Sequence, residues 1–388
     1  MEHNNKKINP FVLFLINISK KYHNYSENLY DKYLDDSKSW NFYMNKFHNK
    51  HKLLIEKKIN TLQNKKISNN TDDIFIIKFL DKQLKKDLID NINKFSNKIL
   101  VDYHPGSNNK VIDIVHPSLY PYIKKELKKN KIKEDFWGRK YEESKFQWLP
   151  SEFRIDNNGK CHIESYINNL PINEKTLYKN LEDIFEYVLP YFEKLWNNIK
   201  KKNNISFKNK TLQVITKIVK INLENKQDLI GAWHVEGMSH ENIIGTASIT
   251  LEQDSKFISN IYFKRTYNID EEMQMVDLIH DPFNKLNELL NNTFIPIGKI
   301  QIQESNIIIF PNSHIHKIDM KNMDSKKSSR ILLVFWLINP DIKIQSTKNL
   351  KQQSYNITLA KKNRLELMKE RTIYKQTLNQ RDLNLCEH

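Results

Sequence analysis

The stretch from residue 211 to 338 constrains the fold most, because strand-like runs follow one another there without helical repeats between them. The runs are rich in β-branched residues, are separated by polar turns, and lie at 211–223, 243–251, 257–263, 299–303, 306–310, 314–318 and 330–338. A parallel sheet needs a long crossover, usually a helix, between successive strands. We therefore expect an antiparallel sandwich or jelly roll.

Helical spacing dominates on both sides of this core, which we assign to 206–345. Residues 1–98 are rich in Lys and Asn and carry apolar residues at helical intervals, as at Leu84, Leu88 and Ile92, which predicts a helical N-terminal region. Residues 99–205 begin with turn-rich segments and end in a helical pattern near 173–200, which predicts an α/loop region packed on the core. Residues 346–388 are predicted to form a C-terminal helical segment, with a helical pattern over 359–379.

No apolar run reaches the roughly 18 to 20 residues that a transmembrane helix needs. The apolar run at 11–18 follows two lysines but lacks a small-residue cleavage site, so we interpret it as a buried helix or strand rather than a signal peptide. The two cysteines, Cys161 and Cys386, exclude a disulfide scaffold and a four-cysteine zinc site. A reducing compartment, cytoplasmic or nuclear, is the expected location.

The formal net charge is +16, from 62 Lys+Arg against 46 Asp+Glu. Such a charge can mark a protein that binds nucleic acid. The chain has only 7 Gly and three Ala, however, while Lys, Asn and Ile are in large excess, as expected of an AT-rich genome. Nucleic acid therefore stays a possible partner that the composition does not favour.

The chemistry-bearing residues lie within the predicted strands or, for His234 and Glu236, directly ahead of the one at 243–251. His234 and Glu236 are two residues apart, so in an extended segment both side chains project to the same face. His316 follows in a later strand-like run, and Arg330 opens the apolar run 14 residues further on. Two histidines and one carboxylate in this order match the facial triad of non-haem iron oxygenases.

The chemistry of that triad explains each residue type. Fe(II) accepts two imidazoles and one carboxylate on one face of an octahedron and keeps three positions open. A 2-oxo acid chelates two of them and O₂ takes the third. The distal carboxylate of 2-oxoglutarate then requires a buried cation, and the planar fork of Arg suits it better than Lys. The pattern predicts His234, Glu236 and His316 as catalytic metal ligands, with Arg330 binding the co-substrate.

Other interpretations of these residues stay open. His314 lies two residues before His316, would share its face in a strand, and competes with it for the ligand position. His240 follows His234 by six residues and is expected beyond the strand, exposed to solvent. Taken singly, a His-x-Glu triplet, a strand histidine and an arginine at a strand end are all common without function.

The sequence resembles the uncharacterised, largely fungal family known as domain of unknown function 4246. The resemblance covers about residues 100–388 and rests on long motifs at 103–120, 146–150, 165–170, 233–238, 310–312, 364–371 and 385–388, together with His316 and Arg330. The family looks like a divergent branch of double-stranded β-helix oxygenases. The resemblance implies the same roles for His234, Glu236, His316 and Arg330, and its register places the second histidine ligand at His316 rather than His314.

Together, these observations predict an α+β protein with a double-stranded β-helix (jelly-roll, cupin-like) core and flanking helices. The expected function is that of an Fe(II)/2-oxoglutarate-dependent oxygenase, which would couple conversion of 2-oxoglutarate and O₂ to succinate and CO₂ with C–H oxidation of an unknown substrate. The rival interpretations are a non-catalytic jelly-roll binding module and a basic nucleic-acid-associated protein.

Overall fold

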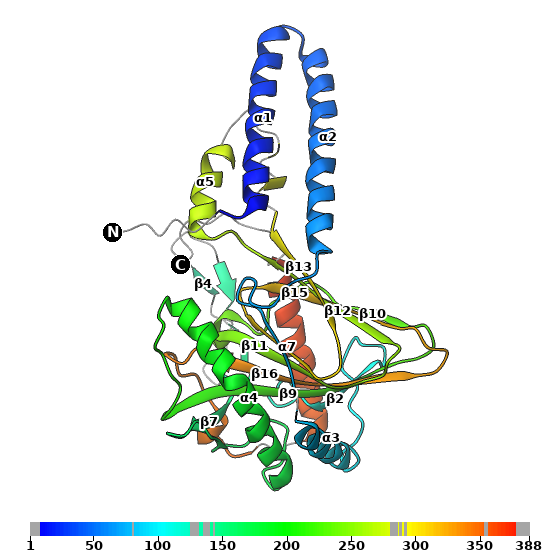
Figure 1. Cartoon of the computed structure of the whole chain (residues 1–388), viewed down its shortest axis with the longest axis vertical. Coiled ribbons are helices and arrows are strands. Elements are labelled where there is room, and N and C mark those ends of the chain that lie inside the picture. The colour runs from blue at the N-terminus through cyan, green and yellow to red at the C-terminus, as the bar shows by residue number, and fades with distance from the viewer. Residues whose placement is uncertain are drawn as a thin grey trace.

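The computed structural model describes residues 8–79, 81–124, 132–134, 140–142, 144–279, 286, 289–290, 293–352 and 356–377. Within these residues the protein combines helices with antiparallel sheets (Figure 1). The helices are α1 (Pro10–Lys32), α2 (Ser37–Gln63), α3 (Lys82–Ser96), α4 (Lys175–Lys200), α5 (Ile269–Ile279) and α7 (Ile357–Thr377), with short 3-10 turns at Ser239–Glu241 and Thr347–Asn349.

The strands divide between two main sheets. The larger sheet has the order β1-β14-β11-β16-β9-β7-β8, with β2 also paired to β9, and the smaller has the order β10-β15-β12-β13. The larger sheet contains β1 (Phe75–Lys78), β2 (Val111–Val115), β7 (Ser151–Ile155), β8 (Cys161–Ile163), β9 (Lys210–Leu223), β11 (Ile243–Gln253), β14 (Asn306–Pro311) and β16 (Ser328–Ile338). The smaller contains β10 (Asp228–Ile230), β12 (Phe257–Arg265), β13 (Ile295–Ile302) and β15 (Ile315–Asn322). Two further pairs are β3 (Tyr122–Ile123) with β6 (Phe146–Gln147), and β4 (Ile132–Glu134) with β5 (Lys140–Glu142).

The apolar strand β16 shows how the layers are built, because its successive side chains point to opposite faces. Leu333 and Phe335 share an apolar cluster with residues of α4, which covers the outer face of the larger sheet (Figure 1). Val334 and Trp336 share a second cluster with residues of β12 and β15 in the smaller sheet. The larger sheet therefore packs on α4 with one face, and on the smaller sheet and part of α7 with the other.

The expected strands and helices are present. The seven strand-like runs correspond to β9, β11, β12, β13, β14, β15 and β16, with residues 303 and 314 just outside the strands. The helical patterns near 173–200 and 359–379 correspond to α4 and α7, and residues 378–388, with Cys386, lie outside the described residues. The prediction missed α5, and it missed that the helical N-terminal region also supplies a strand, β1, which pairs with β14. No helix in the described part of the chain combines the length and apolar character needed to cross a bilayer.

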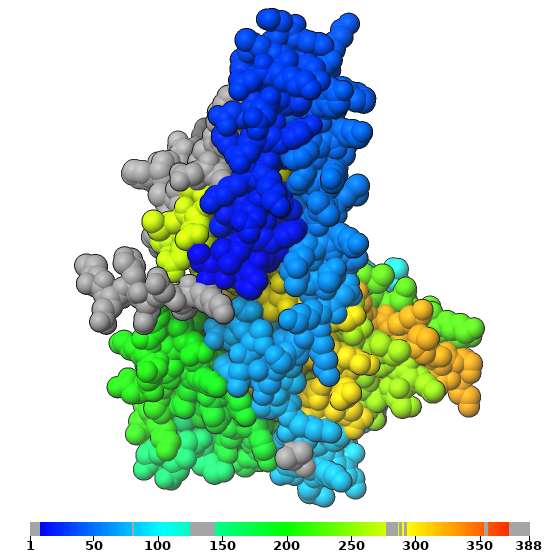
Figure 2. All heavy atoms as spheres, turned by 45° about the horizontal axis from the view of Figure 1, so that its top comes forward, coloured from blue at the N-terminus to red at the C-terminus, as the bar shows by residue number. Residues whose placement is uncertain are grey.

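Helices α1 and α2 form a hairpin that rises from the body of the molecule (Figures 1 and 2). The apolar run at 11–18 lies in α1, as expected of a buried helix, with Phe11, Val12 and Leu15 buried. Stacked rings of Tyr25 and Phe47, with centroids 3.9 Å apart, hold the two helices together.

Gly298 lies where the hairpin meets the smaller sheet. The side-chain amide of Gln63 donates to the Gly298 carbonyl at 3.1 Å, and the Lys299 N–H donates to the Lys65 carbonyl at 2.8 Å. Gly298 has a φ of +138°, and a Cβ there would lie 2.4 Å from the Lys65 carbonyl oxygen. Only glycine permits this approach.

Gly298→Ala should therefore lower the free energy of unfolding by more than about 1 kcal/mol, as measured by urea denaturation, because strain and a steric clash act together. Gly106→Ala is the matched control: Gly106 also has a positive φ, +78°, but no atom lies within 4 Å of its would-be Cβ. Equal losses in the two variants would show that the contact with Lys65 relaxes without cost.

Candidate metal centre

His234 and His316 are brought together by their own backbones. The His234 N–H donates to the His316 carbonyl at 3.0 Å, and the His316 N–H donates to the His234 carbonyl at 2.9 Å. This is a hydrogen-bonded antiparallel pair, in which both side chains project from the same face. The ring centroids lie 4.4 Å apart as a result.

Glu236 is fixed by the side chain of Asn312, which follows β14. The Glu236 N–H donates to Asn312 Oδ1 at 2.8 Å, and Asn312 Nδ2 donates to the Glu236 carbonyl at 2.9 Å. The amide group thus pairs with both backbone groups of Glu236, as a neighbouring strand would. Glu236 Oε1 then lies 3.6 Å from His234 Nε2 and 3.4 Å from His316 Nε2.

The hydrogen bonds of the two imidazoles define which nitrogen carries the proton. His234 Nδ1 lies 2.8 Å from the Ala232 carbonyl, and His316 Nδ1 lies 3.3 Å from the His314 carbonyl. A carbonyl oxygen only accepts hydrogen bonds, so each Nδ1 must be the protonated donor. In the neutral rings both Nε2 lone pairs therefore face the Glu236 carboxylate. In metal sites, a hydrogen bond from the other ring nitrogen to a backbone carbonyl commonly orients a histidine ligand.

The surroundings favour the metal-binding forms of these side chains. Burial alone would raise the pKa of Glu236, but His234 and His316, when they are protonated and donate to it, hold that pKa well below its usual range. Burial lowers the pKa of His316, and the neighbouring His234 lowers it further. An ionised carboxylate and a neutral imidazole are the forms that bind metals.

These three residues are one of two groups of possible metal ligands among the described residues. Their donor set consists of two imidazole nitrogens and one carboxylate oxygen, converging from two adjacent extended segments. Such a set occupies one face of an octahedral ion and suits Fe(II) among other divalent metals. The residues present therefore fit the metal that the sequence predicts.

Arg330 lies on β16 and is 0 % exposed. Its Nη1 donates to Ser259 Oγ at 2.8 Å and its Nη2 to Thr250 Oγ1 at 3.0 Å, while Nε has no hydrogen-bond partner. Nη1 also lies 3.8 Å from Met320 Sδ, and no described carboxylate forms an ion pair with the guanidinium. Burial lowers the pKa of Arg330 to about 10, so the group still carries its charge at neutral pH.

The strand register places Arg330 in the same interior as the three candidate ligands. Its partner Met320 lies four residues after His316 on β15, and its partner Ser259 lies four residues before Phe263 on β12. Residues separated by an even number point to the same face of a strand, and Phe263 pairs directly with His316. The residues of β12 and β15 that contact Arg330 thus lie four residues, about 13 Å of strand, from the pair formed by Phe263 and His316 and on the same face of the smaller sheet.

The two competing histidines lie elsewhere. His314 is in the bend before β15 rather than within the strand, and its Nε2 lies 2.7 Å from the Asp72 carbonyl. His240, expected in solvent, is instead half-buried, with its Nε2 3.0 Å from the Phe146 carbonyl. Neither histidine joins the cluster around Glu236.

Sequence reasoning missed two residues that shape this site, Asn312 and Glu241. Asn312 stands in the Phe-Pro-Asn motif at 310–312, and its position just after an apolar strand is the signal that could have suggested a capping role. Glu241 is fully buried and is the residue whose contacts join the loop after Glu236 to two distant segments. No local pattern indicates that.

The second group of possible ligands comprises His104, Asp113 and His116. The Ser118 N–H donates to His116 Nδ1 at 3.1 Å, so in the neutral ring the proton sits on Nε2, the nitrogen nearer Asp113. Arg364 Nη1 also lies 3.3 Å from Asp113 Oδ2. A protonated nitrogen and a neighbouring guanidinium both oppose a metal ion, so we interpret this group as a structural polar cluster.

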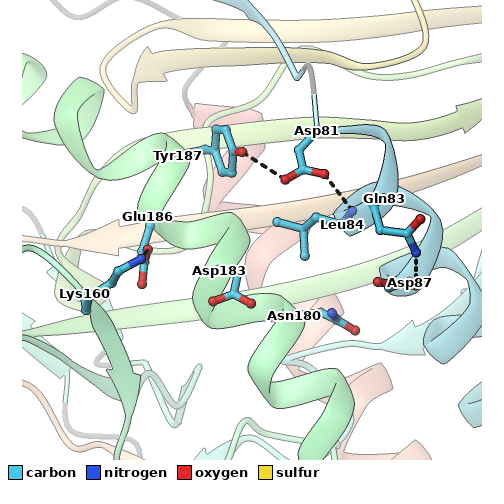
Figure 3. A pocket seen from close by; sticks show the side chains of 9 residues that line it. All are labelled: Asp81, Gln83, Leu84, Asp87, Lys160, Asn180, Asp183, Glu186 and Tyr187. Atoms are coloured by element: carbon cyan, nitrogen blue, oxygen red, sulfur yellow. Dashed lines mark hydrogen bonds and ion pairs between the residues drawn. The ribbon is translucent and has the colours of Figure 1, made fainter.

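A surface hollow of about 580 Å³ lies between α3 and α4 (Figure 3). Several of its polar side chains bind one another: Lys160 pairs with Glu186 at 2.8 Å, and Gln83 Nε2 donates to Asp87 Oδ1 at 2.8 Å. These helices pack on the outer face of the larger sheet, whereas His316 packs against Phe310 and Phe263, which share an apolar cluster between the two sheets. The hollow is therefore separate from the candidate metal centre.

Comparisons with solved structures return distant likenesses. IDO from Bacillus thuringiensis is 7% identical over 73% of this chain and 93% of its own, with a TM-score of 0.37. A prolyl hydroxylase from Trichoplax adhaerens, solved with a hypoxia inducible factor peptide, is 10% identical over 82% and 99%, with a TM-score of 0.34. An oxidoreductase of the 2OG-Fe(II) oxygenase family from Burkholderia pseudomallei is 9% identical over 71% and 88%, with a TM-score of 0.30.

No curated protein matches the sequence. One family model does, over residues 37–206 and 197–361, and its description is "Protein of unknown function (DUF4246)". The match includes His234, Glu236, Asn312, His316 and Arg330, and it reaches further toward the N-terminus than the motifs near residue 100 suggested. Because the matched residues make up most of the chain, this protein belongs to the DUF4246 family.

Proposed function

We propose that this protein is an Fe(II)/2-oxoglutarate-dependent oxygenase of the hydroxylase type, acting on a substrate that the site does not name. In this proposal the two main sheets form a double-stranded β-helix core within 206–345. Residues 1–98, 99–205 and 346–388 surround it as a helical region, an α/loop region and a C-terminal helical segment.

One observation supports the metal above all. In their neutral forms His234 and His316 present lone pairs to the negatively charged oxygen of Glu236, at 3.6 and 3.4 Å. Three electron-rich atoms this close repel one another unless a cation lies among them. Protonation of His316 is opposed by its burial, which lowers its pKa. A divalent metal ion relieves the repulsion at all three atoms at once.

In this proposal each residue of the site has its own role. His234, Glu236 and His316 would hold the iron, and Asn312 fixes the backbone that carries the carboxylate ligand. When bound, Fe(II) and 2-oxoglutarate supply O₂ activation coupled to oxidative decarboxylation, with succinate and CO₂ as products. Phe310 packs against His316, with ring centroids 4.8 Å apart, and keeps water from that side of the ligand.

Arg330 supplies the evidence for an anionic co-substrate. A buried guanidinium without a carboxylate partner costs several kcal/mol. Ser259 and Thr250 orient its fork through neutral hydrogen bonds that do not balance its charge. A small dicarboxylic acid reaching from the metal toward β16 would balance the charge and satisfy the free Nε donor.

The alternatives make different demands on the site. A non-catalytic binding module with this fold has no need for converging nitrogen lone pairs or an uncompensated buried arginine. A nucleic-acid-binding protein would depend on surface cations rather than on these buried groups. The interior chemistry therefore favours the enzyme, and metal and co-substrate binding are the properties to test.

His234→Ala should abolish binding of one divalent metal ion per chain, because it removes one of three ligands. Anaerobic reconstitution with Fe(II) followed by elemental analysis measures the stoichiometry. An unchanged metal content in this variant would show that the metal, if any, is held elsewhere.

Replacement of each neighbouring histidine tests the ligand assignment on β15. His316→Ala should remove the metal, whereas His314→Ala should retain it, because the His314 ring is bonded to the Asp72 carbonyl. The two variants are matched controls, since both remove a buried imidazole from the same segment. Metal loss in His314→Ala alone would move the ligand by two residues.

Arg330→Ala should weaken 2-oxoglutarate binding about 100-fold or more in calorimetry with metal-loaded protein, because a charge-assisted contact to a desolvated carboxylate is lost. Metal affinity should change little, since Arg330 contacts none of the three ligands. Arg330→Lys keeps the charge without the planar fork, so its affinity for 2-oxoglutarate should lie between those of the wild type and Arg330→Ala. Equal affinity in all three proteins would leave Arg330 with only a structural role.

A further inference from the structure

The loop that follows Glu236 is connected to the C-terminal helix by a buried ion pair. Glu241 is 0 % exposed, and its Oε1 accepts from Arg371 Nη2 of α7 at 2.5 Å. The same oxygen accepts from the Trp148 N–H at 2.5 Å, and Oε2 accepts from the Met238 N–H at 2.7 Å. One carboxylate therefore holds three segments that are far apart in the sequence.

The Glu241 carboxylate also lies close to the residue that follows the candidate ligand Glu236. Gly237, which follows Glu236 directly, has a φ of +68°, and a Cβ there would lie 2.7 Å from Glu241 Oε2. The carboxylate thus lies against the turn that leads out of Glu236. A change in the position of Glu241 would act on this turn through Gly237 and the Met238 N–H.

Arg371 is held in place by the ring of Trp148 as well as by Glu241. Its guanidinium carbon lies 3.9 Å from the ring centroid of Trp148, which in turn stacks on Trp336 of β16 at 5.1 Å. Nε and Nη1 of Arg371 are buried without hydrogen-bond partners, so its polar contact among the described residues is the one with Glu241. Removal of either partner leaves the other charge buried and unpaired.

We propose that Arg371 and Glu241 are positioning residues, through which α7 sets the conformation of the metal-binding loop. Neither residue touches the candidate metal centre. The ion pair fixes residues 237–241, and these fix the exit of the chain from Glu236. This inference deepens the proposed function. Its metal-binding measurement rests on that function, whereas its hydrogen-exchange measurement does not.

The same helix offers a matched control two turns earlier. Arg364 is also buried, and its two terminal nitrogens donate to Asp102 at 2.7 and 3.0 Å. It anchors α7 to the segment before β2 and touches neither Glu241 nor the loop at 237–241. Loss of Arg364 should loosen the helix as much as loss of Arg371, without the effect on the loop.

The experiment compares Arg371→Met with Arg364→Met in the full-length protein. Co(II), an oxidation-stable stand-in for Fe(II), is titrated and followed by its visible absorption, and hydrogen exchange of peptides covering 237–245 is measured in the metal-free proteins. We expect Co(II) affinity to fall about tenfold or more in Arg371→Met, in the range found for outer partners of metal ligands. Exchange at 237–245 should accelerate in the same variant. Arg364→Met should stay within about twofold of the wild type in both.

Two gentler variants keep the test decisive if Arg371→Met does not fold. Arg371→Lys keeps the charge and should retain most of the affinity, whereas Glu241→Gln removes the ion pair at nearly constant shape and should lose it. Equal effects of the Arg371 and Arg364 variants on affinity and exchange would overturn the proposal. If the wild type binds no Co(II), the proposed function fails, and hydrogen exchange alone then decides whether Arg371 fixes the loop.

Discussion

The backbone pair between His234 and His316 is the constraint on which the candidate site depends. Its two hydrogen bonds, at 3.0 and 2.9 Å, set the imidazoles side by side before any side-chain contact is made. The carbonyls of Ala232 and His314 then fix the ring nitrogens that face Glu236. The placement of the two rings thus depends on this isolated bridge, and the position of His316 in it is set by the register of β15 in the smaller sheet.

The buried polar groups around the candidate site differ in how their partners balance them. Asn312 and Glu241 satisfy loop amides that the sheets leave unpaired, and their own polar atoms are satisfied in return. Arg330 differs, because its charge has no counter-ion and its Nε no acceptor among the described residues. Since unpaired buried charges are strongly destabilising, this charge is the reason for proposing an anionic co-substrate.

Local patterns predicted what is local. The β-branched runs and turns were enough for the strands, but His234 and Glu236 lie outside the named strands, with His234 in an isolated bridge and Glu236 in a bend. The choice between His314 and His316 depended on where β15 begins, a boundary that propensity does not resolve. The pairing of β1 with β14 and of Glu241 with Arg371 joins segments more than a hundred residues apart. Such contacts arise from tertiary packing and cannot be predicted from a short stretch of sequence.

The distribution of these long-range contacts has a functional consequence. The candidate metal ligands come from the segment at 234–236 and from β15, whereas the groups that hold their loop come from 146–148 and α7. Residues that precede and follow the β core in the sequence therefore help to bring the candidate ligands together. A core excised at 206–345 would keep every candidate ligand and lose Trp148 and Arg371. Because a buried Glu241 without these partners is unfavourable, the loop would have to rearrange, and the flanking regions are best regarded as parts of the site rather than as additions to it.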